Sequence, residues 1–239
     1  MINTHPNIVC GPELRTIPAL CSLLGNIGAL SGGVLADQYG VSTPALDRAF
    51  ASAITEFIEP LRRASGKARI AEKTPANVLH FPVLRRLFPD SPLLCIHRDP
   101  RDVAASLMTM DWRDGSGVRL AITSDLEAAA RLWVASIEVE QSMAGDPQFL
   151  AVRYEDLVSR PDREIRRVFD FLKETPVNAT FFPQVAFDAD AGENEPSNER
   201  VAKPIDTASI GRWRRDLNSE AVRIIERVAG SYMAQRGYV

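Results

Sequence analysis

The stretch from Leu93 to Leu107, LLCIHRDPRDVAASL, predicts a buried strand that runs directly into a helix. Its first residues are mostly apolar, as expected of a strand covered on both faces. Asp99 is suited to cap the following helix. Pro100 suits its first position, because the N–H that proline lacks would have no partner there. The chain is therefore expected to change from strand to helix just after His97.

This junction has the chemistry of an anion site. Free N–H groups and the helix dipole favour negative charge at a helix N-terminus, and Arg98 adds a permanently charged, planar donor. Ser106 lies two helical turns further on, within reach of the same anion if the helix packs alongside it. The alternative is a surface ion pair between Arg98 and Asp102, with Ser106 a serine that merely faces its helix.

On either side of this stretch, short apolar runs alternate with segments of helical periodicity. This pattern predicts a single α/β domain over residues 1–239 with a parallel sheet covered by helices. Ser219 is the expected N-cap of the last helix. The glycine-rich stretches Gly25–Gly28 and Gly32–Gly33 are interpreted as turns, and polar residues Asp188–Glu199 as a surface loop and candidate lid. The strand-like runs are Ile8–Cys10, Ala68–Ala71, Leu93–His97 and Phe149–Arg153, and the helical runs are Leu46–Arg63, Leu126–Met143, Asp162–Leu172 and Ser219–Arg236.

Composition narrows the function classes. Hydrophobic residues make up 45% of the 239 residues and charged residues 25%, values that allow a folded core. The net charge of −3 provides no general attraction to nucleic acid or an anionic membrane, so any anion site must be local. No run reaches about 18 consecutive apolar residues, so no membrane span is expected, and the opening residues do not form a secretory signal.

The cysteines and histidines predict neither a disulfide framework nor a metal site. Three cysteines, Cys10, Cys21 and Cys95, form an odd set without CxxC spacing. The three histidines, His5, His80 and His97, lack metal-ligand spacing. A reducing, cytoplasmic location without a metal cofactor is therefore expected.

Several ordered motifs resemble sulfotransferases that use 3′-phosphoadenosine 5′-phosphosulfate (PAPS). The segment from Arg98 to Ser106 is similar to the motif whose first arginine and last serine hold the donor's 3′-phosphate. This resemblance assigns those roles to Arg98 and Ser106 and implies a P-loop-type parallel sheet flanked by helices. Further matches are Glu72-Lys73-Thr74-Pro75, Leu87-Phe88-Pro89-Asp90, Arg153-Tyr154-Glu155-Asp156-Leu157 and Ile210-Gly211-Arg212-Trp213.

The N-terminal segment His5–Pro18 is similar to tyrosylprotein sulfotransferases in the region of their catalytic base. The resemblance assigns the base to Glu13, which would take a proton from the acceptor hydroxyl. Lys73 falls on a lysine that would stabilise charge on the sulfuryl group and the leaving phosphate. Arg15 is a further catalytic candidate that would clamp substrate, pair with Glu13 or lie on the surface.

The same resemblance extends the donor site to Tyr154, Ser197 and Lys203. Trp213 is interpreted either as a core residue or as a wall of the adenine pocket. The chain also departs from the family pattern. Met110 stands where another donor-site arginine is expected, and Ala71 replaces the cysteine that would pair with Cys10, so no disulfide is expected.

The family's first strand and its Gly-rich phosphosulfate loop have no match in this sequence. Either the chain begins after that segment, or it is a variant that retains half of the donor site. On either reading we expect a chain without this segment to be less stable and impaired in turnover, because the strand would complete the sheet and the loop would supply several N–H donors to the transferring group.

The leading hypothesis is transfer of a sulfuryl group from PAPS to a hydroxyl of tyrosine, carbohydrate or a small alcohol. An alternative is a non-catalytic nucleotide-binding or interaction module that retains only the 3′-phosphate half-site. A P-loop kinase is disfavoured, because no Gly-x-x-x-x-Gly-Lys-Ser/Thr sequence is present.

Overall fold

The computed structural model describes residues 1–182 and 203–239. Strands β1 (Ile8–Cys10), β2 (Arg69–Ala71), β3 (Leu93–His97) and β4 (Phe149–Arg153) occupy the four predicted runs. In the described residues they form two two-stranded parallel sheets, with Cys10 opposite Ala71 in one and His97 opposite Arg153 in the other. The predicted parallel pairing is confirmed. Because both sheets are parallel, the loops that leave each pair emerge at a common edge.

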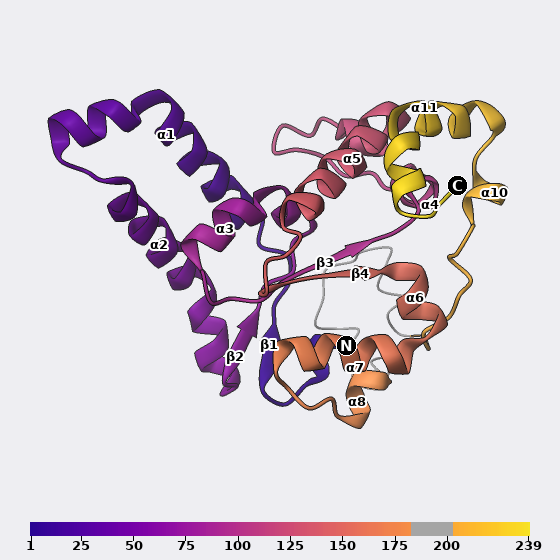
Figure 1. The fold of residues 1–239 in the computed structure, drawn as a ribbon, viewed down its shortest axis with the longest axis horizontal. Helices are drawn as coiled ribbons and strands as arrows, with labels where there is room; N and C mark the ends of the chain where they lie inside the picture. Colours follow the sequence, from indigo (N-terminus) through magenta and orange to yellow (C-terminus); the bar gives the residue numbers. More distant parts are fainter. Residues whose placement is uncertain (183–202) are drawn as a thin grey trace.

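Helices cover these strands and include the four predicted helical segments (Figure 1). The α-helices are α1 (Thr16–Tyr39), α2 (Thr43–Ser65), α3 (Phe81–Leu87), α4 (Pro100–Leu107), α5 (Leu126–Ser142), α6 (Tyr154–Ser159), α7 (Pro161–Leu172), α8 (Asn178–Phe181), α10 (Trp213–Asp216) and α11 (Ser219–Gln235). Short 3-10 helices are η1 (Ile2–Thr4), η2 (Pro75–His80) and η3 (Ala121–Thr123).

Two local sequence expectations are wrong. The N-cap of α11 is Asn218, not Ser219, because the Asn218 side chain accepts the N–H of Ala221 and Ser219 is already helical. The stretches Gly25–Gly28 and Gly32–Gly33 lie inside α1 rather than in turns. The helix ends at Gly40, where φ is 65°.

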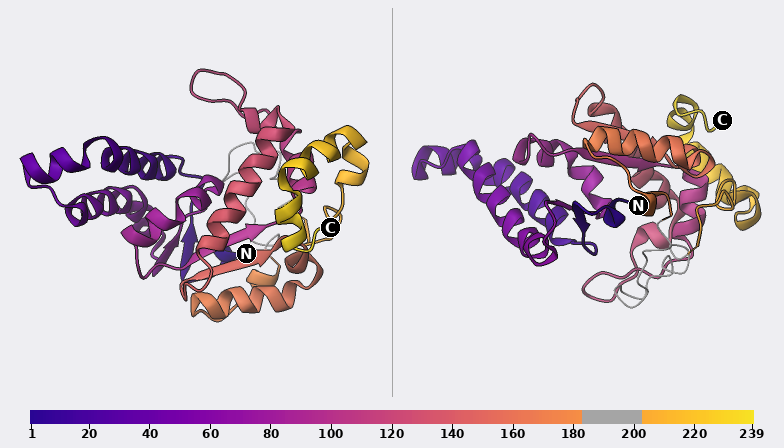
Figure 2. Two further views of the ribbon diagram at one scale, coloured as in Figure 1. Left: turned by 45° about the horizontal axis from the view of Figure 1, so that its top comes forward. Right: turned by 90° about the horizontal axis from the view of Figure 1, so that it is seen from below.

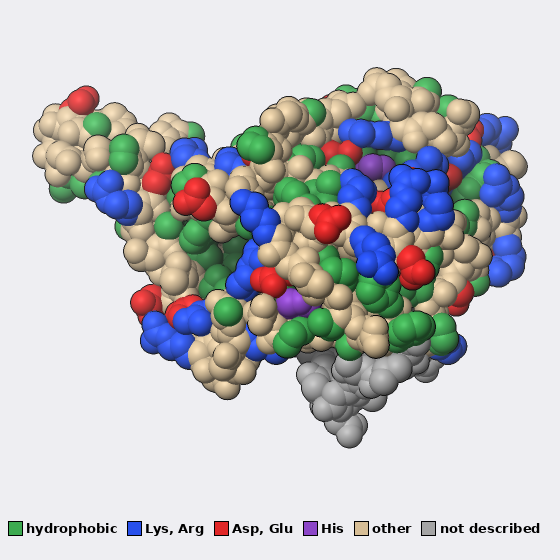
Figure 3. Space-filling view, turned by 60° about the horizontal axis from the view of Figure 1, so that its bottom comes forward, with side chains coloured by type: hydrophobic (Ala, Val, Ile, Leu, Met, Phe, Trp, Pro, Cys, Tyr) green, Lys and Arg blue, Asp and Glu red, His purple; other side chains and the backbone are tan. Residues whose placement is uncertain are grey.

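Helices α1 and α2 project together from the body of the molecule, as both views in Figure 2 show. They are attached at their base by a shared core. Ile17 and Leu24 of α1 and Ile54 of α2 pack with Leu93 and Cys95 of β3. The outer part of α1 exposes apolar side chains, with Leu30 84% and Val34 55% exposed. In Figure 3 a hollow lined by hydrophobic side chains lies where this arm meets the body, and charges of both signs mix over the body.

Helix α1 also corrects the expectation that no segment is long and apolar enough to span a membrane. Within residues 1–182 and 203–239 it is the single helix that meets that criterion by length and composition, with a mean hydropathy of 1.6. Core helices of soluble proteins and signal sequences meet the same criterion. Glycine, serine and asparagine interrupt the apolar residues of this helix, so it contains no long continuous apolar run. They add no charge, however, and Thr16 to Ala36 has no charged residue.

The glycines of α1 provide a first stability prediction. A methyl group on Gly28 would meet no atom within 4 Å. Alanine also loses less backbone entropy in a helix than glycine does. We expect Gly28→Ala to raise the free energy of unfolding by about 0.5–1 kcal/mol. Gly40→Ala is the matched variant and should lower it, because φ is 65° there. Denaturant unfolding measures the free energy of unfolding of both variants. A loss of stability in Gly28→Ala would contradict the exposed position of Gly28 in the middle of α1.

Helices α4, α5 and α11 pack together beside β3. Ala104 of α4, Ala129 and Ala130 of α5, and Ile225 and Ala229 of α11 are almost completely buried. Alanines at these contacts allow close approach of the helix backbones. This packing holds the N-terminus of α4 beside the carboxyl end of β3, where the predicted anion site lies.

Candidate active site

Glu13 and Lys73 meet at the carboxyl ends of β1 and β2. Glu13 lies in the loop between β1 and α1, and Lys73 follows β2 by two residues. The parallel register, with Cys10 opposite Ala71, brings these two segments out at one edge. Lys73 Nζ donates to Glu13 Oε1 at 2.8 Å. Residues 60 positions apart in sequence thus form one contact.

This ion pair remains open to solvent. The Glu13 side chain is 23% exposed and that of Lys73 is 60% exposed. A carboxylate and an ammonium group are therefore available to an incoming molecule at the same point. Arg15 is exposed and precedes α1. Among the described contacts it is Lys73, and not Arg15, that pairs with Glu13.

The junction between β3 and α4 has the predicted local structure. Asp99 caps α4 by accepting the N–H of Arg101 at 2.9 Å, and Pro100 occupies the first helical turn. Arg98 leaves the end of β3, and its guanidinium lies 4.7 Å from the centre of the Tyr154 ring. Its Nη2 donates to the carbonyl oxygen of Ser209. Its Nε is buried and has no hydrogen-bond partner among the described residues.

Asp102 connects this junction to the chain before α10. Its carboxylate lies 3.3 Å from Arg98 Nη2 and accepts the N–H groups of Gly211 at 2.8 Å and Trp213 at 3.0 Å. The Asp102 side chain is only 1% exposed. The alternative of a surface ion pair is therefore wrong in one respect. The pair exists, but it is buried, and it fixes Arg98 beside the Ser209–Trp213 segment.

The other predicted donor-site residues differ in their exposure and in their contacts. Tyr154 lies against Arg98, as described. Ser106 is half-buried one helical turn beyond Asp102, and its hydroxyl makes no hydrogen bond to a described residue. Lys203 is exposed and makes no ion pair with the parts of the chain described. Ser197 and the candidate lid lie outside the described residues.

Trp213 contacts two arginines. The Arg101 guanidinium lies 4.2 Å and that of Arg214 4.5 Å from a Trp213 ring centroid. Arg101 is itself buried and bonded to Asp99 and Glu226, so it supports the fold around the junction. Trp213, which is half-buried, thus packs against Arg101 of the β3–α4 junction.

Comparison with known proteins decides the family. Residues 1–177 match the Sulfotransferase family. The chain belongs to this family. It is 24% identical over 239 residues to protein-tyrosine sulfotransferase A of Caenorhabditis elegans, covering 96% of this chain and 60% of that protein. It is 26% identical over 251 residues to protein-tyrosine sulfotransferase 2 of Gallus gallus, covering 100% of this chain and 64% of that protein. The chain thus spans less than two thirds of these relatives.

A solved structure shows the same fold. The sulfotransferase domain of the Synechococcus PCC 7002 olefin synthase is 21% identical and superposes with a TM-score of 0.59, covering 95% of this chain and 86% of that one. The expected α/β sulfotransferase fold is therefore confirmed.

Two residues that join the ends of β3 and β4, Glu155 and Tyr238, were not predicted from the sequence. Glu155 accepts the N–H of Asp99 at 2.9 Å and the hydroxyl of Tyr238 at 3.2 Å. The Tyr238 carbonyl accepts from Arg101 at 2.7 Å. Burial raises the pKa of the Tyr238 phenol. The position of Glu155 directly after Tyr154 was a usable signal, whereas Tyr238 lies in no motif.

We expect Tyr238→Phe to lower the free energy of unfolding by about 0.5–1.5 kcal/mol, the net worth of one hydrogen bond, because Glu155 loses a donor in a largely buried site. Tyr232→Phe is the matched control, since its hydroxyl also donates to a carboxylate, that of Glu138, at 2.5 Å, but at the surface. Denaturant titrations compare the two variants. Equal losses of unfolding free energy in the two variants would show that the Tyr238–Glu155 hydrogen bond stabilises the protein no more than a surface bond does.

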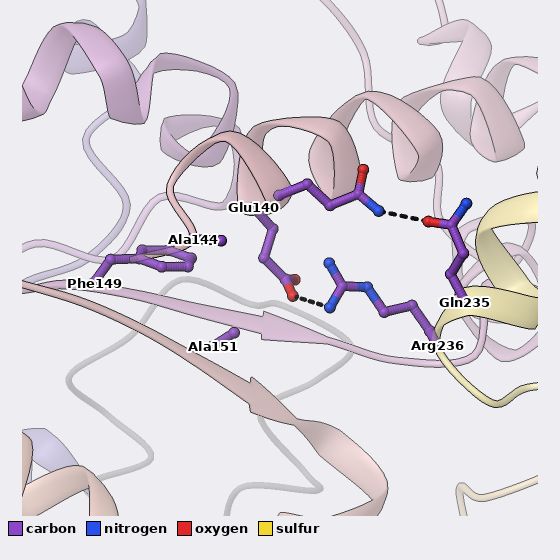
Figure 4. A pocket seen from close by; sticks show the side chains of 7 residues that line it. Glu140, Ala144, Phe149, Ala151, Gln235 and Arg236 are labelled. Atoms are coloured by element: carbon purple, nitrogen blue, oxygen red, sulfur yellow. Dashed lines mark hydrogen bonds and ion pairs between the residues drawn. The ribbon is translucent and has the colours of Figure 1, made fainter. Parts of the chain in front are cut away.

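A cavity of about 440 Å³ lies elsewhere, between α5, β4 and α11. Figure 4 shows Glu140 and Arg236 pointing toward each other along it. Arg236 Nη1 lies 2.9 Å from Glu140 Oε1, and the other Glu140 oxygen lies 2.9 Å from His97 Nδ1. None of the predicted site residues lines this cavity. Its polar groups support His97, the residue before Arg98.

None of the three cysteines is among the predicted site residues. Cys10, Cys21 and Cys95 are free thiols, and burial raises the pKa of each. Within residues 1–182 and 203–239, no group of three or more His, Cys, Asp or Glu side chains is arranged to hold a metal ion.

Proposed function

We propose that this chain transfers a sulfuryl group from PAPS to a hydroxyl group of an acceptor, with a protein tyrosine as the first acceptor to test. The observation that carries the proposal is the 2.8 Å contact between Glu13, a half-buried base, and Lys73, an exposed cation, beside the carboxyl ends of β1 and β2. The names of the relatives, protein-tyrosine sulfotransferases, support the choice of tyrosine. Carbohydrate and small alcohols remain acceptors to compare.

Glu13 is the general base of this proposal. A phenol or alcohol is a weak nucleophile at neutral pH, and a carboxylate within hydrogen-bond reach accepts its proton as the oxygen attacks sulfur. The new bond joins the acceptor oxygen to sulfur. The bond between sulfur and the bridging oxygen of the donor breaks, and 3′-phosphoadenosine 5′-phosphate leaves with that electron pair.

Lys73 supplies positive charge where negative charge develops. Its ammonium group is held near Glu13 before any substrate binds, so little reorganisation is needed during the reaction. The charge stabilises the sulfuryl oxygens and the bridging oxygen of the leaving group. A base and a cation in contact fit sulfuryl transfer better than a module that only binds a nucleotide.

Arg98 is the residue we assign to the donor's 3′-phosphate. Its buried Nε has no described partner and can donate to a phosphate oxygen. The Ser106 hydroxyl, on the Asp102 face of α4, is a second donor. Tyr154 limits the orientations open to the guanidinium by covering it with an aromatic ring. These features fit a phosphate ligand, although Asp102 already offsets part of the arginine's charge.

Transfer of labelled sulfate tests the proposal. The chain is incubated with PAPS and, in separate reactions, a tyrosine peptide, an oligosaccharide and a small alcohol, with and without magnesium. We expect label in the peptide and no magnesium requirement. Saturable binding of 3′-phosphoadenosine 5′-phosphate without transfer to any acceptor would instead favour the non-catalytic module, and magnesium dependence would favour a phosphotransferase.

A further inference from the structure

The two segments that carry Glu13 and Lys73 are joined by a second set of contacts beside their ion pair. The N–H of Leu14, the residue after Glu13, donates to Thr74 Oγ1 at 2.8 Å and approaches Glu72 Oε1 at 3.2 Å. The Thr74 hydroxyl in turn donates to Glu72 Oε1 at 2.5 Å. Glu72 and Thr74 flank Lys73 in sequence. One short chain of hydrogen bonds therefore links the neighbours of both proposed active-site residues.

The Thr74 side chain makes these contacts instead of capping its own helix. It stands at the N-cap of η2 with an extended backbone, where a threonine hydroxyl commonly accepts an N–H of its own helix. Here the side chain makes no capping hydrogen bond. The hydroxyl oxygen instead accepts the N–H of Leu14, 60 positions away. Thr74 is 7% exposed, so little water is available to replace a lost contact.

Glu72 is held from its other side. Asn77 Nδ2 of η2 donates to Glu72 Oε2. One carboxylate thus accepts from η2 and from the Thr74 hydroxyl while it faces the Glu13 loop. Hydrogen-bond chains of this kind fix geometry more firmly than separate bonds, because each bond polarises the next.

We propose that Glu72 and Thr74 are positioning residues that fasten the Glu13 loop to the Lys73 turn and so set the distance between base and cation. Neither side chain needs to touch substrate. This inference rests on the proposed role of Glu13. Its physical basis is that a small displacement of a base from its substrate lowers the rate without altering donor binding.

The test compares Thr74→Val, which keeps the shape but removes the hydroxyl, with Thr74→Ser, which keeps the hydroxyl. We expect Thr74→Val to lower kcat roughly three- to tenfold, the worth of one hydrogen bond, and Thr74→Ser to restore most of it. The affinity for 3′-phosphoadenosine 5′-phosphate should be unchanged. Amide exchange at Leu14 should be faster in Thr74→Val and close to normal in Thr74→Ser.

Thr180→Val is the matched control. Thr180 of α8 is completely buried, and its hydroxyl donates to the carbonyl oxygen of Val177, the residue just before α8, rather than to the Glu13 loop. An equal loss of kcat in this control would assign the Thr74 effect to general destabilisation. Unchanged kcat and unchanged Leu14 exchange in Thr74→Val would overturn the inference.

A parallel Glu13→Gln variant separates this inference from the proposed function. If Glu13→Gln keeps normal turnover, the base assignment fails. If Glu13→Gln loses turnover while Thr74→Val does not, only the positioning role fails. If the chain transfers no sulfate at all, Leu14 exchange still shows whether Thr74 fastens the loop.

Discussion

Glu13→Gln should lower kcat for sulfate transfer by roughly 10²- to 10⁴-fold, the usual contribution of a general base. The glutamine amide cannot accept the acceptor's proton, but its carbonyl oxygen can still accept a hydrogen bond from Lys73. The substitution therefore removes the chemistry while it leaves the Glu13–Lys73 contact available. Because the proposed phosphate site is at Arg98, on the other sheet, donor affinity should stay near that of the unaltered protein.

Steady-state rates with labelled PAPS measure this effect, and calorimetry with 3′-phosphoadenosine 5′-phosphate measures donor binding. Glu127→Gln is a suitable control, because Glu127 is a surface carboxylate paired with Arg131 in α5, outside the site. Turnover in Glu13→Gln within a few-fold of normal would place the base elsewhere. A loss of nucleotide affinity equal to the loss of rate would show that Glu13 acts on binding instead.

The junction between β3 and α4 could be predicted because its signals are local. An apolar run, the cap residue Asp99 and Pro100 lie within a few positions of one another, and the structure has each as predicted. The contact of Glu13 with Lys73 was not a local signal. It became foreseeable only through a resemblance that gave both residues roles in one reaction.

Helix α1 shows where local signals mislead. Glycine has a low helix propensity, so Gly25, Gly28, Gly32 and Gly33 favoured turns. The helix forms nevertheless, since its inner face packs Ile17, Cys21 and Leu24 into the shared core. Tertiary packing of one end outweighs the propensity cost along the rest.

Side-chain contacts between distant segments could not be predicted from the sequence. Arg98 meets Ser209 across 111 positions, and Arg101 meets Tyr238 across 137. No periodicity or motif spacing encodes such pairs. Asp102 is likewise buried by residues distant in sequence, Gly211 and Trp213, which explains why a surface ion pair was a reasonable but mistaken alternative.

Arg98→Ala should weaken binding of 3′-phosphoadenosine 5′-phosphate by about 1.5–3 kcal/mol, or roughly 10- to 150-fold, the range for a hydrogen bond to a charged group. The loss should appear in nucleotide affinity, because Arg98 lies at the proposed anion site of β3 and α4 rather than beside Glu13. Ser106→Ala should cost less, since a neutral hydroxyl is more easily replaced by water.

Stability must be measured with affinity, because Arg98 also neutralises the buried Asp102. The Asp102 carboxylate keeps its bonds from Gly211 and Trp213 in Arg98→Ala, so the junction retains part of its support. Arg98→Lys is the sharper variant. It preserves the charge opposite Asp102 but loses the planar guanidinium, so it should stay folded and bind the nucleotide with intermediate affinity. If both variants are folded and calorimetry gives the affinity of the unaltered protein, the phosphate is bound by other residues and the assignment of Arg98 falls.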